Sequence, residues 1–294
     1  MKKIIISIIA IITSILMFSF DEPVYNIRPH TLKVVILCGQ SNMEGARTTT
    51  YSSTYSGFQK SYIYYKADTT TAGVVINYHQ QLYNSWHGAD SLVGPDVSFG
   101  KEYYDRTGEP ILMIKYAEGS SVLCDDGSSF QSRGIWQVDA NNTRANGKAH
   151  YRKLLNKFLI PCILNCKNRG INLEFVSFFW CQGESDANVL YSSSHYQTEL
   201  IRLIDSVKVN LNRYGVLSPK FKPIITRLND VYTPQRPYLY QIRTAQQNVV
   251  NHYGGYLINA DNFLFQYDNI HFSGDGQVEH GIKAATLLVD SILP

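Results

Sequence analysis

The chain has 294 residues, of which 44% are hydrophobic and 17% are charged, and its formal net charge is +3. This composition provides enough apolar side chains for a large core and lacks the charge excess of disordered chains. Lys2 and Lys3 account for two of the positive charges, so removing the N-terminus would leave a net charge of about +1, which excludes nucleic-acid binding through a basic surface.

The first twenty residues are predicted to form a targeting segment. A short positive start, residues 1–3, precedes an almost continuous apolar run from Ile4 to Phe18. Because no good small-x-small cleavage site follows, an uncleaved membrane anchor is the alternative to a signal peptide. Both interpretations predict a protein that is secreted, periplasmic or otherwise outside the cytoplasm. No internal repeat or composition shift marks a boundary in the rest of the chain, so residues 30–294 are predicted to form one folded domain, which contacts a membrane only through such an anchor.

Short apolar runs alternate with helical patterns along the rest of the chain. The runs predicted to be strands are 32–38, 111–116, 175–181, 222–227 and 256–260, and the helical patterns include 151–169 and 196–214. This alternation predicts an α/β fold with a mostly parallel, doubly wound sheet. Residues 46–75 and 119–148, rich in small polar residues, are predicted to be long loops that follow strand ends and border a binding site.

The five cysteines do not have the spacing of a disulfide framework. They are Cys38, Cys124, Cys162, Cys166 and Cys181, an odd number, so at least one is unpaired. Cys38 and Cys181 lie in apolar runs and are expected to be inert core thiols. Cys162 and Cys166 are four residues apart on a predicted helix, but no clustered histidine or second cysteine pair accompanies them. We therefore expect neither a metal site nor a cofactor.

Two motifs at opposite ends of the chain predict a catalytic triad. Ser41 lies within residues 39–43, Gly-Gln-Ser-Asn-Met, directly after the first predicted strand. A serine hydroxyl is a poor nucleophile without a base, so this motif alone also fits a structural turn. Asp268 and His271 are three residues apart. This spacing lets the carboxylate accept from Nδ1–H and leaves Nε2 as the base, which predicts a Ser41–His271–Asp268 triad.

A third segment, residues 180–186, has the sequence Trp-Cys-Gln-Gly-Glu-Ser-Asp and follows another predicted strand. Acyl transfer needs two or three hydrogen-bond donors aimed at the developing oxyanion. We predict that these are the backbone N–H groups of Ser41 and Gly119 and the side-chain amide of Gln182. The residues expected to support these groups are Gln40, Asn42 and Glu184.

Two carboxylates in this segment allow different interpretations. Glu184 and Asp186 resemble the acid and base of a glycosidase, which needs two carboxylates across a sugar. We favour the alternative, in which Glu184 is a buried hydrogen-bonding residue and Asp186 caps the next segment.

Together these segments resemble the sialate O-acetylesterase-like branch of the SGNH hydrolases, which includes the acetylxylan esterases of carbohydrate esterase family six. The matching motifs occur in the family's order and extend over nearly the whole chain after the targeting segment. They are Gly-Gln-Ser-Asn-Met at 39–43, the segment around Gly119, Trp-x-Gln-Gly-Glu-Ser-Asp at 180–186, Ile242-Arg243-x-x-Gln246 and Asp268-x-x-His271.

The resemblance implies a flavodoxin-like three-layer α/β/α sandwich and a metal-free esterase that removes acetyl groups from sugars. It also implies that Ser41 is the nucleophile, that Asp268 and His271 complete the triad, and that Gly119 and Gln182 are oxyanion donors. Two positions depart from the family's pattern. Glu118 stands where glycine or alanine is expected, and Cys181 stands where glutamine is frequent. Both departures affect the expected shape and polarity of the acyl pocket.

The predicted function is two-step acyl transfer from an acetylated glycan such as acetylxylan or an acetylated sialic acid. A different serine hydrolase activity, of the lipase or thioesterase type, is one alternative, and an apolar acyl tunnel would distinguish it. A glycan-binding protein without activity is the other alternative. Such a protein would be expected to lack one of the triad residues, but all three are present.

Overall fold

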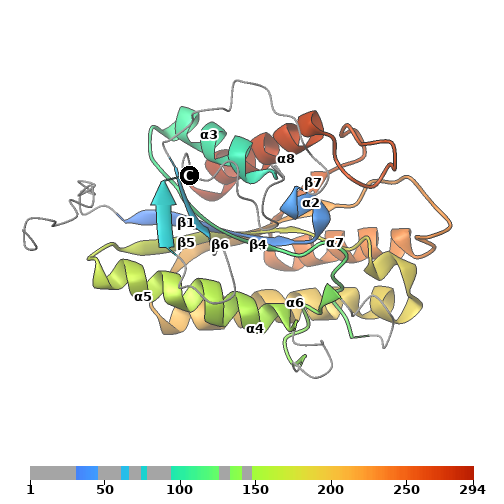
Figure 1. Cartoon of the computed structure of the whole chain (residues 1–294), viewed down its shortest axis with the longest axis horizontal. Helices are drawn as coiled ribbons and strands as arrows, with labels where there is room; N and C mark the ends of the chain where they lie inside the picture. Colours follow the sequence, from blue (N-terminus) through green and yellow to red (C-terminus); the bar gives the residue numbers. More distant parts are fainter. Residues whose placement is uncertain (1–30, 46–60, 66–73, 78–93, 126–132, 141–147) are drawn as a thin grey trace, which may run out of the picture. The chain divides into compact units, whose positions relative to one another are not determined.

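The computed structural model describes residues 31–45, 61–65, 74–77, 94–125, 133–140 and 148–294. Its strands are β1 (Leu32–Gly39), β2 (Tyr62–Tyr65), β3 (Val74–Asn77), β4 (Leu112–Ala117), β5 (Leu173–Cys181), β6 (Leu217–Arg227) and β7 (Tyr256–Asn259). They form one sheet in the order β3-β2-β4-β1-β5-β6-β7, in which only the pairing of β2 with β3 is antiparallel among the described strands (Figure 1).

Helices cover both faces of this sheet and complete three layers. They are α2 (Ser41–Glu44), α3 (Asp96–Thr107), α4 (His150–Lys153), η4 (Leu154–Leu159), α5 (Ile160–Asn168), η5 (Asp186–Asn188), α6 (Leu190–Arg213), α7 (Leu239–Tyr253), α8 (Gly274–Leu287) and η6 (Leu288–Ile292). Figure 1 shows α3 and α8 on one side of the sheet and α4, α5, α6 and α7 on the other. None of the helices in the described part of the chain is long and apolar enough to cross a membrane.

The structure confirms the predicted α/β fold and the five predicted strands. The five strands β4-β1-β5-β6-β7 are all parallel and have the flavodoxin-like order. The prediction of a loop over residues 46–75 is wrong in part, because β2 and the start of β3 lie within it. These two strands are only four residues long, too short for an alternating pattern to stand out from a Ser-, Thr- and Tyr-rich segment.

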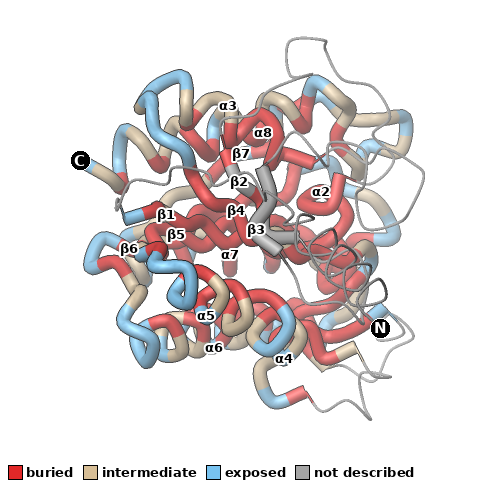
Figure 2. The backbone as a smooth tube through the Cα atoms, turned by 60° about the vertical axis from the view of Figure 1, so that its left-hand side comes forward, coloured by how far each residue is buried: buried red, intermediate tan, exposed pale blue. Residues whose placement is uncertain are grey.

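The central strand β1 divides the core into two halves. Val34 and Ile36 pack in the cluster that contains residues of α5, α6 and α7, whereas Val35 and Leu37 pack in the cluster with α3 and α8. Successive side chains of a strand point to opposite faces, so a strand covered on both faces is apolar throughout. The centre of the sheet is accordingly buried (Figure 2), and each buried methylene stabilises the fold by about 0.8 kcal/mol.

Gly39 ends β1 and allows the close approach of β5. Its φ is +154°, and a Cβ at this position would lie 1.9 Å from the carbonyl oxygen of Cys181. The clashing atom belongs to the backbone of a central strand, so it cannot move without disturbing the sheet.

We expect Gly39→Ala to lower the free energy of unfolding by about 3–5 kcal/mol in a denaturant titration. Gly215→Ala is the control, because that position also has a positive φ but no atom within 4 Å, and it should cost about 1 kcal/mol. Equal costs would contradict this account.

The sheet topology brings three predicted site segments together. The chain passes from β1 to β2 and β4 on one side, and then crosses to β5 on the other side. Ligands bind at such a switch point, beyond the carboxyl ends of the strands. Ser41 follows β1, Gly119 follows β4 and Gln182 follows β5, so all three residues lie at this edge of the sheet.

Candidate active site

Ser41 is the first residue of α2, at the end of the central strand. Gln40 connects this turn to β5: its N–H donates to the carbonyl oxygen of Cys181 at 3.0 Å, and its Oε1 accepts from the N–H of Gly183 at 3.4 Å. These bonds hold the nucleophile's turn between two parallel strands. Gln40 therefore lies where the sequence predicts it, as a residue that supports the turn of Ser41.

The structure brings Ser41, His271 and Asp268 into one hydrogen-bonded chain. Ser41 Oγ lies 3.0 Å from His271 Nε2, and His271 Nδ1 lies 2.7 Å from Asp268 Oδ2. Because the carboxylate can only accept, Nδ1 carries the proton and Nε2 is left to accept from the serine hydroxyl. The geometry is that of a serine nucleophile, its base and the group that orients the base.

Asp268 is held in its ionised form. Its Oδ1 accepts from the backbone N–H groups of Ile270 and His271, each at 2.9 Å. Burial by itself would raise the pKa of Asp268, but the hydrogen bonds from His271 and Ile270 outweigh burial and lower the pKa from 3.8 to about 2. The carboxylate therefore keeps its charge throughout the neutral range and fixes the imidazole tautomer.

This lowered pKa predicts a contribution of Asp268 to acid stability. A carboxylate with a depressed pKa in the folded state stabilises the fold above its unfolded pKa, and this stability is lost as the pH falls through the folded pKa. We expect the difference in unfolding free energy between the parent and Asp268→Asn to decrease by about 2 kcal/mol between about pH 5 and pH 2. Urea titrations of both proteins across this range test the prediction, and a difference that is independent of pH would contradict it.

The side chain of Asn42, next to the nucleophile, holds the backbone on both sides of His271. Asn42 Nδ2 donates to the carbonyl oxygen of Ile270 at 2.9 Å, and its Oδ1 accepts from the N–H of Phe272 at 2.9 Å. Nδ2 also donates to Glu184 Oε1 at 2.8 Å. Because Nδ2 faces two acceptors and Oδ1 faces a donor, only one orientation of this amide fits. Asn42 thus fixes the position of His271 relative to Ser41.

Glu184 and Arg236 lie behind this amide. Glu184 is buried, and its Oε2 has no hydrogen-bond partner among the described residues. Burial raises the pKa of Glu184, whereas its own backbone N–H, Asn42 and the charge of Arg236 oppose the rise. Arg236 is itself buried, and burial lowers the pKa of its guanidinium, whereas the carboxylates of Glu184 and Asp268 oppose this shift. The sequence does not indicate Arg236, because one arginine between two prolines has no spacing that relates it to Ser41, His271 or Asp268.

The two residues predicted to supply backbone donors for the oxyanion, Ser41 and Gly119, lie next to each other. The N–H of Ser41 is at the start of α2, whose backbone bonds begin at Met43 and Glu44. A Cβ on Gly119 would lie 3.7 Å from Ser41 Cβ and 3.0 Å from Glu44 Oε2. Gly119 therefore passes directly beside the nucleophile, in a turn whose next residue, Ser120, has a φ of 60°.

The predicted role of Gln182 requires a correction. Its side chain is fully buried, and Nε2 donates to the carbonyl oxygen of Ser121 at 3.1 Å and to Asp186 Oδ2 at 2.6 Å. An amide nitrogen has two hydrogens, so neither remains for an oxyanion. Asp186 also accepts from the N–H groups of Leu123 and Cys124, at 3.0 and 3.2 Å. It does not cap the following segment as expected; with Gln182 it anchors the loop that follows β4.

No group of three His, Cys, Asp or Glu side chains within the described residues could hold a metal ion. Cys38 and Cys181 are buried thiols that form no disulfide, and burial raises the pKa of both.

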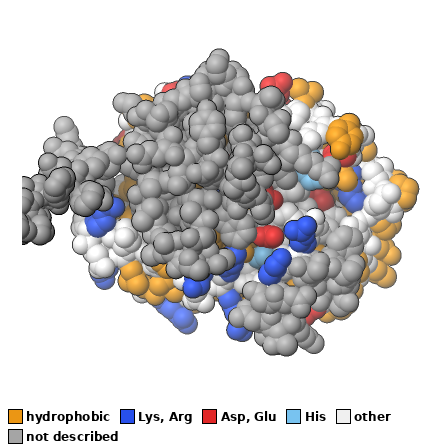
Figure 3. Space-filling view, in the orientation of Figure 1, with side chains coloured by type: hydrophobic (Ala, Val, Ile, Leu, Met, Phe, Trp, Pro, Cys, Tyr) orange, Lys and Arg blue, Asp and Glu red, His pale blue; other side chains and the backbone are white. Residues whose placement is uncertain are grey.

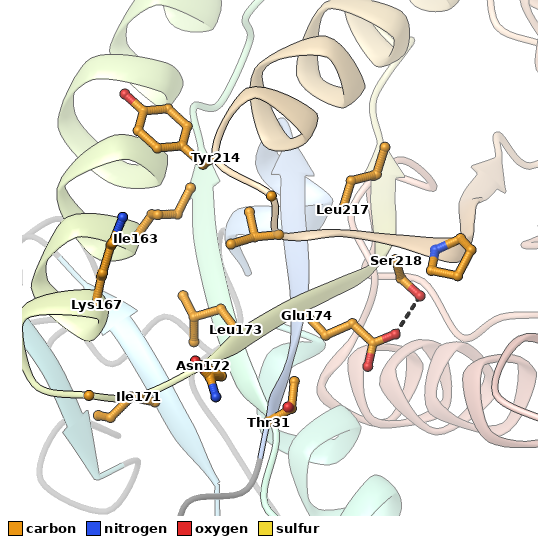
Figure 4. A pocket seen from close by; sticks show the side chains of 14 residues that line it. Thr31, Ile163, Lys167, Ile171, Asn172, Leu173, Glu174, Tyr214, Leu217 and Ser218 are labelled. Atoms are coloured by element: carbon orange, nitrogen blue, oxygen red, sulfur yellow. Dashed lines mark hydrogen bonds between the residues drawn. The ribbon is translucent and has the colours of Figure 1, made fainter.

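A separate hollow of about 490 Å³ lies at the other edge of the sheet (Figure 4). It is lined at the amino-terminal ends of β1, β5 and β6, where Ser218 Oγ donates to Glu174 Oε1 at 2.6 Å. None of the triad residues lines this hollow. The candidate active site is therefore the carboxyl edge, which carries Ser41.

The family model described as carbohydrate esterase, sialic acid-specific acetylesterase, matches residues 31–290. The chain belongs to this family. The esterase is accordingly a carboxylic ester hydrolase of a carbohydrate esterase family, as its motifs predicted. No protein of curated function matches its sequence.

Solved structures share the fold of the esterase. A protein of Arabidopsis thaliana is 18% identical with a TM-score of 0.64, and the match covers 90% of the esterase and 100% of that protein. A protein named NanS is 12% identical with a TM-score of 0.61, over 90% and 99% of the two chains. A carbohydrate acetylesterase of Xanthomonas citri is 14% identical with a TM-score of 0.57, and the match covers 87% of the esterase but 56% of that chain. At these identities the likeness establishes the fold.

Proposed function

We propose that the esterase removes O-acetyl groups from an acetylated carbohydrate through a covalent acetyl-enzyme. The observation that carries the proposal is the contact of 3.0 Å between Ser41 Oγ and His271 Nε2, in a site where Asp268 orients the imidazole. The family's description as a carbohydrate esterase supports an acetylated sugar as the substrate class. The Xanthomonas citri protein that shares the fold is a carbohydrate acetylesterase, which agrees with that class.

In the first step, Ser41 Oγ attacks the carbonyl carbon of the acetyl ester and passes its proton to His271 Nε2. The carbonyl oxygen becomes an oxyanion, which the N–H groups of Ser41 and Gly119 stabilise. When this intermediate collapses, the bond to the sugar oxygen breaks and the sugar takes the proton from Nε2. The acetyl group is then bound to Ser41 Oγ.

In the second step, a water molecule attacks the acetyl-enzyme and gives its proton to His271 Nε2. Acetate leaves, and the proton returns to Ser41 Oγ. Asp268 stays ionised throughout and stabilises the imidazolium that forms in each step. Each oxyanion donor contributes about 10²- to 10³-fold to kcat in sites of this kind.

We also propose that the reaction takes place outside the cytoplasm. The positive start and apolar run of residues 1–18 support this location, and they lie outside the described residues. Cell fractionation with N-terminal sequencing of the recovered protein tests it. Recovery of an uncleaved chain from the soluble cytoplasm would contradict the proposal.

The experiment for the activity is acetate release from p-nitrophenyl acetate and from acetylated xylan, sialic acid, pectin and mucin glycans. We expect the parent and the control Ser291→Ala, an exposed serine near the C-terminus, to release acetate. Ser41→Ala should be slower by about 10⁴-fold or more. Activity confined to long-chain esters would favour the lipase or thioesterase alternative. An inactive parent, or equal rates in the parent and Ser41→Ala, would favour the glycan-binding alternative.

A further inference from the structure

A groove of about 500 Å³ lies between α6 and α7, away from the triad. Ser193, Ser194 and Gln197 line it from α6, and Tyr240, Gln241 and Asn248 line it from α7. None of the described residues that line it is charged, and most carry an amide or a hydroxyl group. The groove therefore offers hydrogen bonds to a ligand without attracting ions of either sign.

Two hydrogen bonds across the groove orient its amides. Ser193 Oγ lies 2.7 Å from Gln241 Oε1 and 3.0 Å from the carbonyl oxygen of Leu190, and Asn248 Nδ2 donates to Gln197 Oε1 at 2.9 Å. Neither Gln197 Nε2 nor Gln241 Nε2 has an acceptor among the described residues, so each can donate to a ligand. The glutamine side chains are half-buried or exposed, so both donors are accessible to a ligand in the groove.

Exposed aromatic rings lie on the first turns of both helices, and one of them, Tyr240, lines the groove. Tyr240 is 60% exposed on the first turn of α7. Tyr191, on the first turn of α6, is 50% exposed and stacks on His195 with 4.1 Å between the ring centroids. Figure 3 shows hydrophobic side chains gathered along the right-hand edge of the view. A tyrosine presents a flat apolar ring together with a hydroxyl, a combination that suits a ligand with both apolar and polar surface.

The groove begins at the edge of the sheet that carries the triad. The helix α6 follows β5 through η5, and α7 follows β6, so the first turns of both helices lie beyond the carboxyl ends of these strands. The residues that line the groove all belong to the first three turns. A long ligand bound there therefore lies on the same side of the molecule as Ser41.

We propose that this groove is a second binding site, for a neutral glycan chain. Sugar hydroxyls pair with the amide and hydroxyl groups, and the apolar face of a sugar ring packs on Tyr240. A nucleic acid or an anionic lipid would need basic side chains, which the described lining lacks. The inference rests on the proposed function, because the glycan that binds the groove is the chain whose acetyl groups reach Ser41.

The test measures binding without turnover, in the full-length Ser41→Ala protein. Native gels that contain soluble xylan, glucomannan or galactan, all deacetylated, report binding as retarded migration. We expect at least one polysaccharide to retard the protein. Adding Tyr240→Ala or Gln241→Ala should raise the apparent Kd about tenfold, whereas Tyr240→Phe keeps the ring and should retain binding. The matched controls are Tyr214→Ala, an exposed tyrosine at the other end of α6, and Gln247→Ala, a glutamine of α7 outside the groove.

Retardation that is the same in all variants, or absent for every polysaccharide, would overturn the proposal. Sedimentation velocity supplies a further check, because a dimer that Tyr240→Ala dissociates would make a second copy of the chain the occupant. The polysaccharides carry no ester, so binding is independent of the esterase reaction. Retardation without acetate release by the parent would refute the proposed function but support a glycan-binding site in the groove. Acetate release without retardation would support the proposed function and refute the binding site.

Discussion

His271→Ala is expected to lower kcat on p-nitrophenyl acetate by about 10⁴- to 10⁶-fold, the largest effect of any substitution outside Ser41. The imidazole is the only base in contact with Ser41 Oγ among the described residues, at 3.0 Å. Without it, the hydroxyl keeps its proton and the departing alcohol has no acid. Residual activity would come from the backbone donors of Ser41 and Gly119.

Initial rates at saturating substrate measure this effect, and His252→Ala is the control because His252 is exposed at the end of α7. A loss in His271→Ala that is no larger than in His252→Ala would exclude the imidazole as the base. The melting temperatures of both variants show whether either substitution disturbs the fold.

Asn42→Asp is expected to lower kcat by about 100-fold while KM changes by about threefold or less. The substitution keeps the shape of the side chain but replaces Nδ2 with a carboxylate oxygen. That oxygen would face the carbonyl of Ile270 and the carboxylate of Glu184, the two acceptors that Nδ2 now satisfies. The loop that carries His271 then shifts relative to the nucleophile, and a shift of about 1 Å is enough for this loss.

Asn251→Asp is the matched control. Asn251 Oδ1 accepts from Gln247 Nε2 at 3.0 Å on the exposed side of α7, and an aspartate keeps that acceptor. If both substitutions reduce kcat equally, Asn42 does not position the base. If Asn42→Asp raises KM with kcat unchanged, the residue acts on substrate binding instead.

The amino-acid sequence was sufficient to predict the central strands and the proximity of Ser41, His271 and Asp268. A parallel strand covered by helices on both faces reads as an apolar run, which identifies β1 and β5 without knowledge of their neighbours. The triad could be predicted because its parts have local signatures: a serine in a turn directly after a strand, and an aspartate three residues before a histidine. The flavodoxin-like order then brings together segments that are 230 residues apart.

The sequence could not specify how the polar groups of the site pair with one another. The sequence predicts Gln182 as an oxyanion donor, because its amide follows a predicted strand. In the structure Gln182 Nε2 donates instead to Asp186, four residues further along the chain. For Asn42 the sequence predicts only a supporting role, and its bonds to the backbone on both sides of His271 are found only in the structure. Such pairings depend on backbone positions that no residue pattern encodes.

Covalent labelling of Ser41 tests the central claim most directly. A fluorophosphonate transfers its phosphonyl group to an activated serine with loss of fluoride, and peptide mass spectrometry then locates the group. We predict labelling at Ser41 in the parent, much slower labelling in His271→Ala, and loss of acetate release in proportion to the label. Labelling of another serine, or full acetate release by protein whose Ser41 is completely labelled, would contradict the account.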